Sequence, residues 1–326
     1  MAPNFQSEGE FVRWLKRLAP PRTPNVRLGI GDDAAVVRIA PDQELILTTD
    51  MSIEGVHFSR RLHPARSVGH RALARSLSDI AAMGAAPRYA LVSLALAHSS
   101  GQHWVQGFYL GIRALAERFG VAVVGGDTAR VPNGCFVDVI VAGEAGRGRA
   151  LSRAGARPGD EIWVSGRLGL SAWGLELLKS QRRPRSTDAA AALHAHLYPE
   201  PQCGLGQFLS KRRLALALMD ISDGLSTDLS RLCAASGVGA KIWAERLPIL
   251  ATGDPPHALT LALHGGEDYQ LLFTVPARRA ARLPARFHGL PLRQIGEIQR
   301  GRRLSLVGID GNTSDLEPGG WDYFRK

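Results

Sequence analysis

The chain has 326 residues, of which 45% are hydrophobic and 36 are glycine, so we expect a globular protein of two domains with many tight turns. Its formal charge is +10, but the arginines are scattered and not interleaved with aromatic residues, so we expect no nucleic-acid partner. No apolar run approaches the roughly 20 residues of a membrane span, and the N-terminus has no signal-peptide pattern. With three cysteines that form no close pair, these features predict a cytoplasmic protein with no membrane partner.

Apolar periodicity and turn signals predict the elements of the first half of the chain. An opening helix carries Phe11, Leu15 and Leu18 on one face and ends before Pro20. A segment rich in Gly, Arg and Ala at 147–159 predicts a domain boundary, which gives domains 1–150 and 151–326. Between the opening helix and this boundary we expect strands at 45–47, 89–97, 121–124 and 136–143, and helices at about 67–83 and 102–119.

The second half repeats the mixture of strands and helices. A polar and basic segment at 180–188 predicts a loop, and alternating apolar strands predict sheets with one covered face. The fold class is therefore α/β (α+β) with two lobes. We expect strands at 161–164, 214–219, 269–275, 294–297 and 304–307, and helices at about 170–178 and from 223 onward.

Aspartates recur in short turns, most of them after an apolar, strand-like run. Carboxylates that gather at the end of a sheet repel one another, by roughly 1 kcal/mol for two charges about 4 Å apart in water and by more in a cleft. Mg²⁺ removes that cost, and its usual companion is a polyphosphate. The chain therefore reads as a Mg²⁺–nucleotide enzyme. The turns are Gly29-Ile30-Gly31-Asp32-Asp33, Thr48-Thr49-Asp50, Ser78-Asp79, Gly125-Gly126-Asp127-Thr128 and Asp220-Ile221-Ser222-Asp223-Gly224.

Each turn has an ordinary structural explanation as well. Gly125-Gly126 could be only a tight turn, and Ser222 or Asp223 could be only a helix N-cap. The spacing at Gly29–Ala34 matches a dinucleotide fingerprint, but no buried strand precedes it and two carboxylates stand where a pyrophosphate would lie. No P-loop, protein-kinase or nucleophile-elbow motif is present. Phosphoryl transfer that depends on positioning and cations fits the remaining pattern best.

The series of turns, in this order and with its neighbours, resembles the thiamine-monophosphate kinase family of the aminoimidazole ribonucleotide synthetase superfamily. The neighbouring motifs are Glu54-Gly55-Val56-His57-Phe58, Leu151-Ser152-Arg153-Ala154-Gly155-Ala156, Gly265-Gly266-Glu267-Asp268-Tyr269 and Gly320-Trp321. The resemblance implies an N-terminal lobe that binds ATP and Mg²⁺ and a C-terminal lobe that completes the site in a cleft. It also implies a homodimer formed by the N-terminal lobes, and transfer of the ATP γ-phosphoryl group to thiamine monophosphate to give thiamine diphosphate.

The resemblance also implies the site residues. Several Mg²⁺ ions would be held by Asp33, Thr48, Thr49, Asp50, Asp79, Asp127, Asp220 and Asp223. ATP would be contacted by Tyr109, Gly126, Asp127, Arg153 and Ser222, and thiamine monophosphate by His57, Glu267 and Trp321, with no protein general base. Two alternatives stay open: another ATP-dependent enzyme of the superfamily, of the purine synthetase or hydrogenase-maturation type, or a nucleotide-sensing or nucleic-acid-binding module without turnover.

Overall fold

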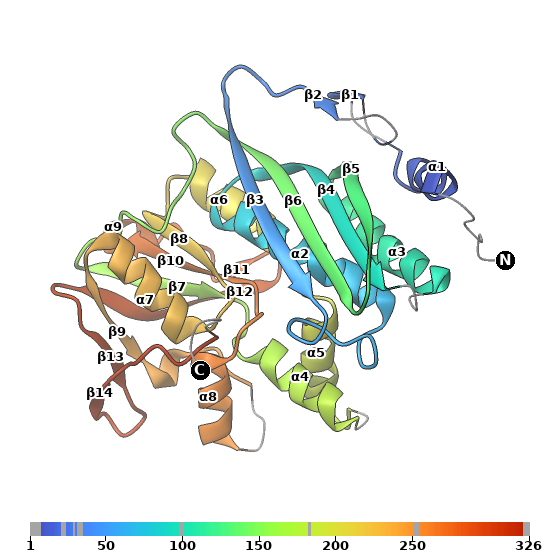
Figure 1. Ribbon diagram of the computed structural model, residues 1–326. Coiled ribbons are helices and arrows are strands. Elements are labelled where there is room, and N and C mark those ends of the chain that lie inside the picture. The colour runs from blue at the N-terminus through green and yellow to red at the C-terminus, as the bar shows by residue number, and fades with distance from the viewer. Residues whose placement is uncertain are drawn as a thin grey trace. The chain divides into compact units, whose positions relative to one another are not determined.

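The computed structural model describes residues 8–20, 24–28, 30, 35–97, 101–181, 184–250 and 254–321 (Figure 1). Contacts divide the chain into two compact units. Unit 1 comprises Met1–Ile80 and Ala85–Gly148, and unit 2 comprises Ala81–Gly84 and Arg149–Lys326. Among the described residues, no helix is long and apolar enough to cross a membrane.

Unit 1 is built on a four-stranded sheet of order β3-β6-β4-β5, in which only the β4–β5 pair is parallel. Two long helices lie on one face of this sheet (Figure 1). They cross at backbone distance, because a Cβ on Gly69 would lie 1.9 Å from the carbonyl oxygen of Phe108. The elements are α1 (Glu8–Leu18), β1 (Val26–Leu28), β2 (Val36–Val37), β3 (Gln43–Ile53), α2 (Ala65–Ala82), β4 (Ala86–Ala97), α3 (Gln102–Phe119), β5 (Ala122–Val131) and β6 (Cys135–Gly146).

The sheet of unit 1 has one covered and one open face. In β6 the residues Val137, Val139 and Val141 are at most 1% exposed, whereas the alternate residues are more open. On the open face β3 presents Leu47 and Met51, whose exposed fractions are 64% and 55%. Since successive residues of a strand point to opposite faces, this alternation matches a sheet packed by helices on one side, as predicted.

Unit 2 has a larger sheet of order β14-β13-β9-β12-β7-β10-β8, with β11 paired to β12 and one parallel pair, β13 with β9. Its helices are α4 (Leu170–Ser180), α5 (Thr187–Leu197), α6 (Cys203–Lys211), α7 (Leu225–Ser236), the 3-10 turn η1 (Ala244–Arg246), α8 (Pro255–His264) and α9 (Ala277–Ala280). Its strands are β7 (Asp160–Ser165), β8 (Ala217–Ile221), β9 (Gly239–Trp243), β10 (Gln270–Pro276), β11 (Arg286–Phe287), β12 (Leu290–Gln299), β13 (Leu304–Val307) and β14 (Thr313–Asp315).

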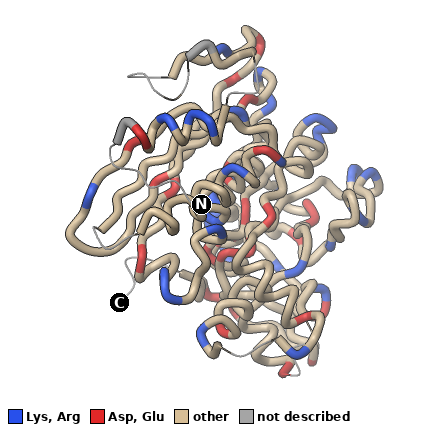
Figure 2. Tube along the Cα trace, turned by 90° about the vertical axis from the view of Figure 1, so that its right-hand side faces the viewer, with Lys and Arg blue, Asp and Glu red and all other residues tan. Residues whose placement is uncertain are grey.

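The core of unit 2 forms where α7 and α8 meet the sheet. Leu229 and Leu232 of α7 are fully buried against strand residues such as Ile162 and Leu272. Lysine and arginine residues are spread along the chain and are interspersed with aspartates and glutamates (Figure 2). The helices α5, α6 and α8 and the strand β9 were not predicted, and α5 begins inside the segment expected to be a loop.

Three of the acidic segments do not lie in turns, which corrects that expectation: Ser78-Asp79 lies late in α2, within the helix expected at about 67–83, and the other two lie in strands. Thr48, Thr49 and Asp50 stand in the middle of β3, because β6 pairs with that strand along its whole length. Gly126 and Asp127 likewise lie within β5, which continues to Val131 beside β4. These side chains are therefore placed on the faces of a sheet, and the alternation of the strand decides which of them meet.

Candidate active site

The covered face of unit 1 brings together Thr48, Asp50 and Asp79. The two β3 residues point toward α2, where the Oγ1 of Thr48 donates a hydrogen bond to Oδ2 of Asp79. Burial, with the charge of Asp79 as the next cause, raises the pKa of Asp50 from 3.8 to about 7. Arg75 offsets this only in part, since its Nη2 is 3.7 Å from Oδ1 of Asp50. Two carboxylates are thus held close to each other at a cost that a cation would remove.

These groups suit a magnesium ion. Oδ2 of Asp50 is buried and accepts no hydrogen bond, which is unusual for a carboxylate oxygen. Hydroxyl and carboxylate oxygens are the ligands that Mg²⁺ prefers, and one or two carboxylates are enough when water and phosphate supply the rest. Within the described ranges no three His, Cys, Asp or Glu residues form a group that could hold a metal by themselves. Thr48, Asp50 and Asp79 would thus suit an ion that takes its other ligands from water or phosphate.

The remaining acidic residues of unit 1 lie on the open face of the sheet. Thr49 donates from Oγ1 to Oδ1 of Asp138, 2.7 Å away on β6. Asp138 and Asp127 both pair with Ser93, so they share this face. Asp127 accepts a hydrogen bond from the backbone N–H of Thr128 at 2.8 Å. The structure thus separates Thr49 and Asp127 from Thr48, Asp50 and Asp79 by the thickness of the sheet, and Asp138 was not predicted.

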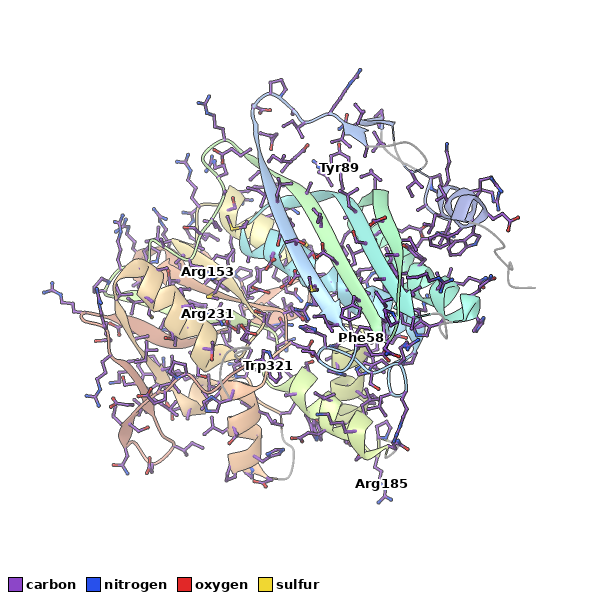
Figure 3. The ribbon with its side chains drawn as sticks, in the orientation of Figure 1. Phe58, Tyr89, Arg153, Arg185, Arg231 and Trp321 are labelled. Atoms are coloured by element: carbon purple, nitrogen blue, oxygen red, sulfur yellow. The ribbon has the colours of Figure 1, made fainter. Side chains whose placement is uncertain are left out.

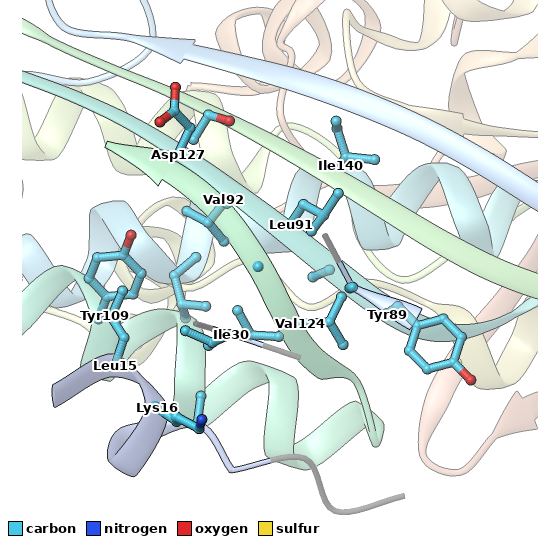
Figure 4. A pocket seen from close by; sticks show the side chains of 18 of the residues that line it. Leu15, Lys16, Ile30, Tyr89, Leu91, Val92, Tyr109, Val124, Asp127 and Ile140 are labelled. Carbon is cyan, nitrogen blue, oxygen red and sulfur yellow. The ribbon is translucent and has the colours of Figure 1, made fainter. Parts of the chain in front are cut away.

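A cavity of about 1080 Å³ lies in unit 1, between α1, α3 and strands β4 and β5. Tyr109, Gly126 and Asp127, three of the predicted ATP residues, line it. Asp127 and Lys16 are at opposite ends of the close view, with apolar side chains between them (Figure 4). Burial raises the pKa of Tyr109 far above its usual value, so the phenol stays neutral. Apolar walls with charged ends are typical of a site for an amphiphilic ligand.

The backbone geometry at Gly126 requires glycine, apart from any contact with a ligand. Its φ is +155°, and a Cβ there would lie 1.9 Å from the carbonyl oxygen of Val92 on β4. The pairing of β4 with β5 shifts register just before this point, between Ala90 and Leu91. The glycine is therefore required by the close approach of two strands, whatever ligand lies beside it.

His57 is held in the loop that follows β3. Its Nδ1 accepts a hydrogen bond from the backbone N–H of Ile53 at 3.0 Å, so in the neutral ring the proton is on Nε2. The carbonyl of His57 accepts from Nη2 of Arg71 at 3.2 Å, and Glu54 forms an ion pair with Arg60 at 2.8 Å. The imidazole is thus oriented through Nδ1, and its Nε2–H has the character of a hydrogen-bond donor.

In unit 2 the predicted turn begins in β8, whose Asp220 is 4% exposed, and ends at α7. The backbone N–H groups of Ser222, Asp223 and Gly224 all donate to Oδ2 of Asp228, at 3.0, 3.0 and 3.1 Å. Burial, followed by the charge of Asp223, raises the pKa of Asp228 from 3.8 to about 6. Asp228 was missed, although an acid in the first turn of a helix is a recognisable signal.

Arg231 joins the two carboxylates of this turn. Its Nη1 donates to Oδ1 of Asp228 at 3.0 Å and to Oδ2 of Asp223. Arg153, the other basic residue predicted here, is exposed, and its carbonyl accepts a hydrogen bond from Oγ of Ser236 at 2.9 Å. Figure 3 labels both arginines on unit 2.

Glu267 and Trp321 both attach to the turn through their backbones. The N–H of Glu267 donates to the carbonyl of Ser222 at 2.7 Å, and the N–H of Trp321 donates to the carbonyl of Asp223 at 2.9 Å. The Trp321 side chain is 53% exposed. Oε2 of Glu267 is 3.9 Å from Nδ1 of the buried His196, a neighbour that the sequence did not suggest.

The described residues thus bring part of the predicted set together, as one group in each unit. Thr48, Asp50 and Asp79 meet in unit 1, and Asp223, Glu267 and Trp321 surround one turn in unit 2. Asp33 lies outside the described residues.

Comparisons with known proteins give the same family over most of the chain. The family model of the AIR synthase related protein N-terminal domain matches residues 31–145, and that of the C-terminal domain matches 157–309. The chain is 37% identical to the thiamine-monophosphate kinase of Salmonella typhimurium, over 97% of this chain and 98% of the relative. It is 35% identical to the crystal structure of thiamine-monophosphate kinase from Stenotrophomonas maltophilia, with a TM-score of 0.81 and coverage of 94% and 96%. A structure described as AaThiL complexed with AMPPCP and TMP is 34% identical, with a TM-score of 0.78 and coverage of 97% of each chain.

Proposed function

Because the chain belongs to the thiamine-monophosphate kinase family of AIR synthase related proteins, we propose that it transfers the γ-phosphoryl group of ATP to thiamine monophosphate, giving thiamine diphosphate and ADP. The acceptor phosphate is already an anion at neutral pH, so no protein base is needed. Catalysis then depends on positioning and on neutralising charge. This reaction would make the protein the last enzyme in the synthesis of thiamine diphosphate.

Magnesium, when bound, neutralises the charge that develops on the transferring phosphoryl oxygens. Thr48, Asp50 and Asp79 of unit 1 would hold an ion from the covered face of its sheet, and Asp220 and Asp223 of unit 2 belong to the ligands proposed for the several ions. Thr49, Asp127 and the undescribed Asp33 belong to the same proposed set of ligands for several ions. This assigns ATP and Mg²⁺ binding to domain 1–150 and completion of the site to 151–326.

The nucleotide would occupy the cavity of unit 1, where Tyr109 and Gly126 line the wall and Asp127 stands at one end. Arg153 and Ser222 would contact the phosphates from unit 2. For the acceptor, the indole of Trp321 offers a face to the cationic thiazolium or the aminopyrimidine. Glu267 would add a negative charge, and Nε2–H of His57 a hydrogen bond.

The observation that carries the proposal is the buried Oδ2 of Asp50. This oxygen has no hydrogen-bond partner, and it lies near a second carboxylate, that of Asp79. Without a cation, replacing either acid would stabilise the fold, and this supports the proposal that the pair binds a metal.

The test is to incubate the purified protein with Mg²⁺ and ATP, with thiamine monophosphate in one reaction and thiamine in the other. We expect thiamine diphosphate in the first reaction and no phosphorylated product in the second, as measured by chromatography. Product from thiamine alone would contradict the acceptor assignment. ATP binding without turnover on either would contradict the kinase assignment.

The proposal includes a homodimer formed by the open face of the unit 1 sheet. Leu45, Leu47 and Met51 of β3 are 44%, 64% and 55% exposed, and Phe136 of β6 is 40% exposed. A row of large apolar side chains on one sheet face is costly in water and is typical of an interface. We propose that a second copy covers it, and that the protein works in the cytoplasm, where ATP is at hand and its free thiols stay reduced.

Substitution of Met51→Glu should dissociate that dimer. A carboxylate buried in an apolar interface costs several kcal/mol, which raises the dimer dissociation constant by at least about 100-fold. Sedimentation equilibrium measures the change, with Ile309→Glu as the matched control, because Ile309 is 75% exposed and lies in unit 2. A Met51→Glu protein that stays dimeric would show that the interface is elsewhere.

A further inference from the structure

The turn formed by Ser222, Asp223 and Gly224 is held by the carboxylate of Asp228. Three consecutive backbone N–H groups of the turn converge on Oδ2 of Asp228, at 3.0–3.1 Å. The Asp228 side chain is fully buried. Three charge-assisted hydrogen bonds to one atom fix the orientation of three peptide planes at once. The carbonyls of the same planes must then point away from Asp228.

Those carbonyls are the attachment points of two other segments. Ser222 accepts the N–H of Glu267, and Asp223 accepts the N–H of Trp321. Both segments approach without a side chain between them. A Cβ on Gly266 would lie 2.7 Å from the Ser222 oxygen, and one on Gly320 would lie 2.0 Å from the Asp223 oxygen. Any rotation of the turn therefore moves the backbones that carry Glu267 and Trp321.

The Asp223 side chain is set by the same carboxylate through Arg231. Oδ1 of Asp228 accepts from Nη1 of Arg231 at 3.0 Å, and this nitrogen also donates to Oδ2 of Asp223. Arg231 is 40% exposed on α7 (Figure 3). One buried residue thus connects the side chain of a proposed metal ligand with the backbones of two proposed acceptor-binding residues.

We propose that Asp228 is a positioning residue for phosphoryl transfer, which holds the 222–224 turn so that Asp223, Glu267 and Trp321 keep one arrangement. It acts by two separate routes. The backbone route, through Oδ2, sets the segments that bind thiamine monophosphate. The side-chain route, through Oδ1 and Arg231, sets Asp223. This inference rests on the proposed function and adds to it a residue that touches neither substrate nor metal.

The two routes are separated by two variants. Asp228→Asn keeps the shape of the side chain, but it removes the negative charge that strengthens the three hydrogen bonds from the turn, and its amide can accept on only one side. We expect the dissociation constant of thiamine monophosphate, measured by calorimetry, to rise at least about 10-fold, or about 1.4 kcal/mol. Arg231→Gln leaves the contacts of Oδ2 in place. It should raise the KM of Mg-ATP about 3–10-fold and leave the affinity for thiamine monophosphate within twofold of the parent.

The matched control is Asp160→Asn. Asp160 is 5% exposed and accepts the backbone N–H of Arg157 at 2.8 Å, so it is also a buried carboxylate bonded to backbone, but at the start of β7. This variant should be less stable, but the dissociation constant of thiamine monophosphate and the KM of Mg-ATP should stay within twofold of the parent values. A purely structural role for Asp228 would give the same result in Asp228→Asn. If Asp228→Asn is insoluble, Asp228→Glu retains the charge, displaces the carboxylate by one methylene and should show the same loss to a smaller extent.

The outcomes distinguish this inference from the proposed function. If the parent protein makes no thiamine diphosphate, the function is wrong. If the parent is active and a folded Asp228→Asn or Asp228→Glu protein binds thiamine monophosphate as the parent does, the positioning role is wrong. Equal losses of acceptor affinity in Arg231→Gln and Asp228→Asn would overturn the separation into two routes.

Discussion

Asp50→Asn should abolish most of the activity and make the metal-free protein more stable. The amide is a weaker ligand, so we expect kcat to fall about 10²–10³-fold, the usual effect of removing one electrostatic contact to a transition state. The free energy of unfolding rises because the repulsion between Asp50 and Asp79 disappears. Each kcal/mol of added stability raises Tm by about 2–4 °C in a chain of this size. Steady-state assays and calorimetric melting in EDTA measure the two effects.

The control for this prediction is Asp42→Asn, an exposed acid in the turn before β3 of the same unit. It should change neither kcat nor Tm. Mg²⁺ should raise the Tm of the parent and of Asp42→Asn, but should have a much smaller effect on Asp50→Asn. Activity near that of the parent in Asp50→Asn, or a drop in its melting temperature in EDTA, would refute the assignment of this site to a metal.

Gly126→Ala should prevent unit 1 from folding, whereas the neighbouring Gly125→Ala should be tolerated. The alanine at 126 would place its methyl 1.9 Å from a backbone oxygen of β4 and would adopt a φ of +155°. Neither strand can move without breaking the sheet, so we expect a loss of more than about 4 kcal/mol and little soluble protein. At 125 the methyl would instead meet the end of the Leu91 side chain at 3.0 Å, which can rotate away.

The yield of soluble protein and the urea midpoint of unfolding compare the two glycine variants. If both are equally stable, the close approach of β4 and β5 is not what requires glycine here. If both are folded and lose only affinity for ATP, the glycines serve the nucleotide, as the sequence alone suggested.

Long elements with a strong apolar period were predicted well from the sequence. The helix expected at 102–119 is α3, and the strand expected at 304–307 is β13. The strands that carry acidic residues were predicted too short, because polar residues, such as those at 48–50 in β3, interrupt the apolar pattern. Strand β3 continues through them only because β6, nearly a whole unit later in the chain, supplies its hydrogen bonds. Pairing between distant segments leaves no mark on the local period.

The same reasoning explains which site residues were found. Thr48, Asp50 and Asp79 could be named from their chemistry, but that Thr49 faces the other side of the sheet follows from strand alternation. Asp228 carries a local signal, an acid in the first turn of α7, which could have been read. His196 carries none, since the alanine-rich α5 shows no distinct apolar face, and its contact with Ser171 on α4 depends on tertiary packing.

The segment that ends in Trp321 is bonded at three successive peptide groups to the first turn of α7 and to the turn that precedes it. Gly319 donates to Oγ of Ser226, Gly320 to Oγ1 of Thr227, and Trp321 to the carbonyl of Asp223. During synthesis the turn at Asp223 leaves the ribosome long before these partners exist. The nascent protein can therefore build the core of unit 2 while the segment proposed to bind the acceptor is still missing. A message truncated just before codon 319 should yield a chain that folds, escapes proteolysis and is inactive.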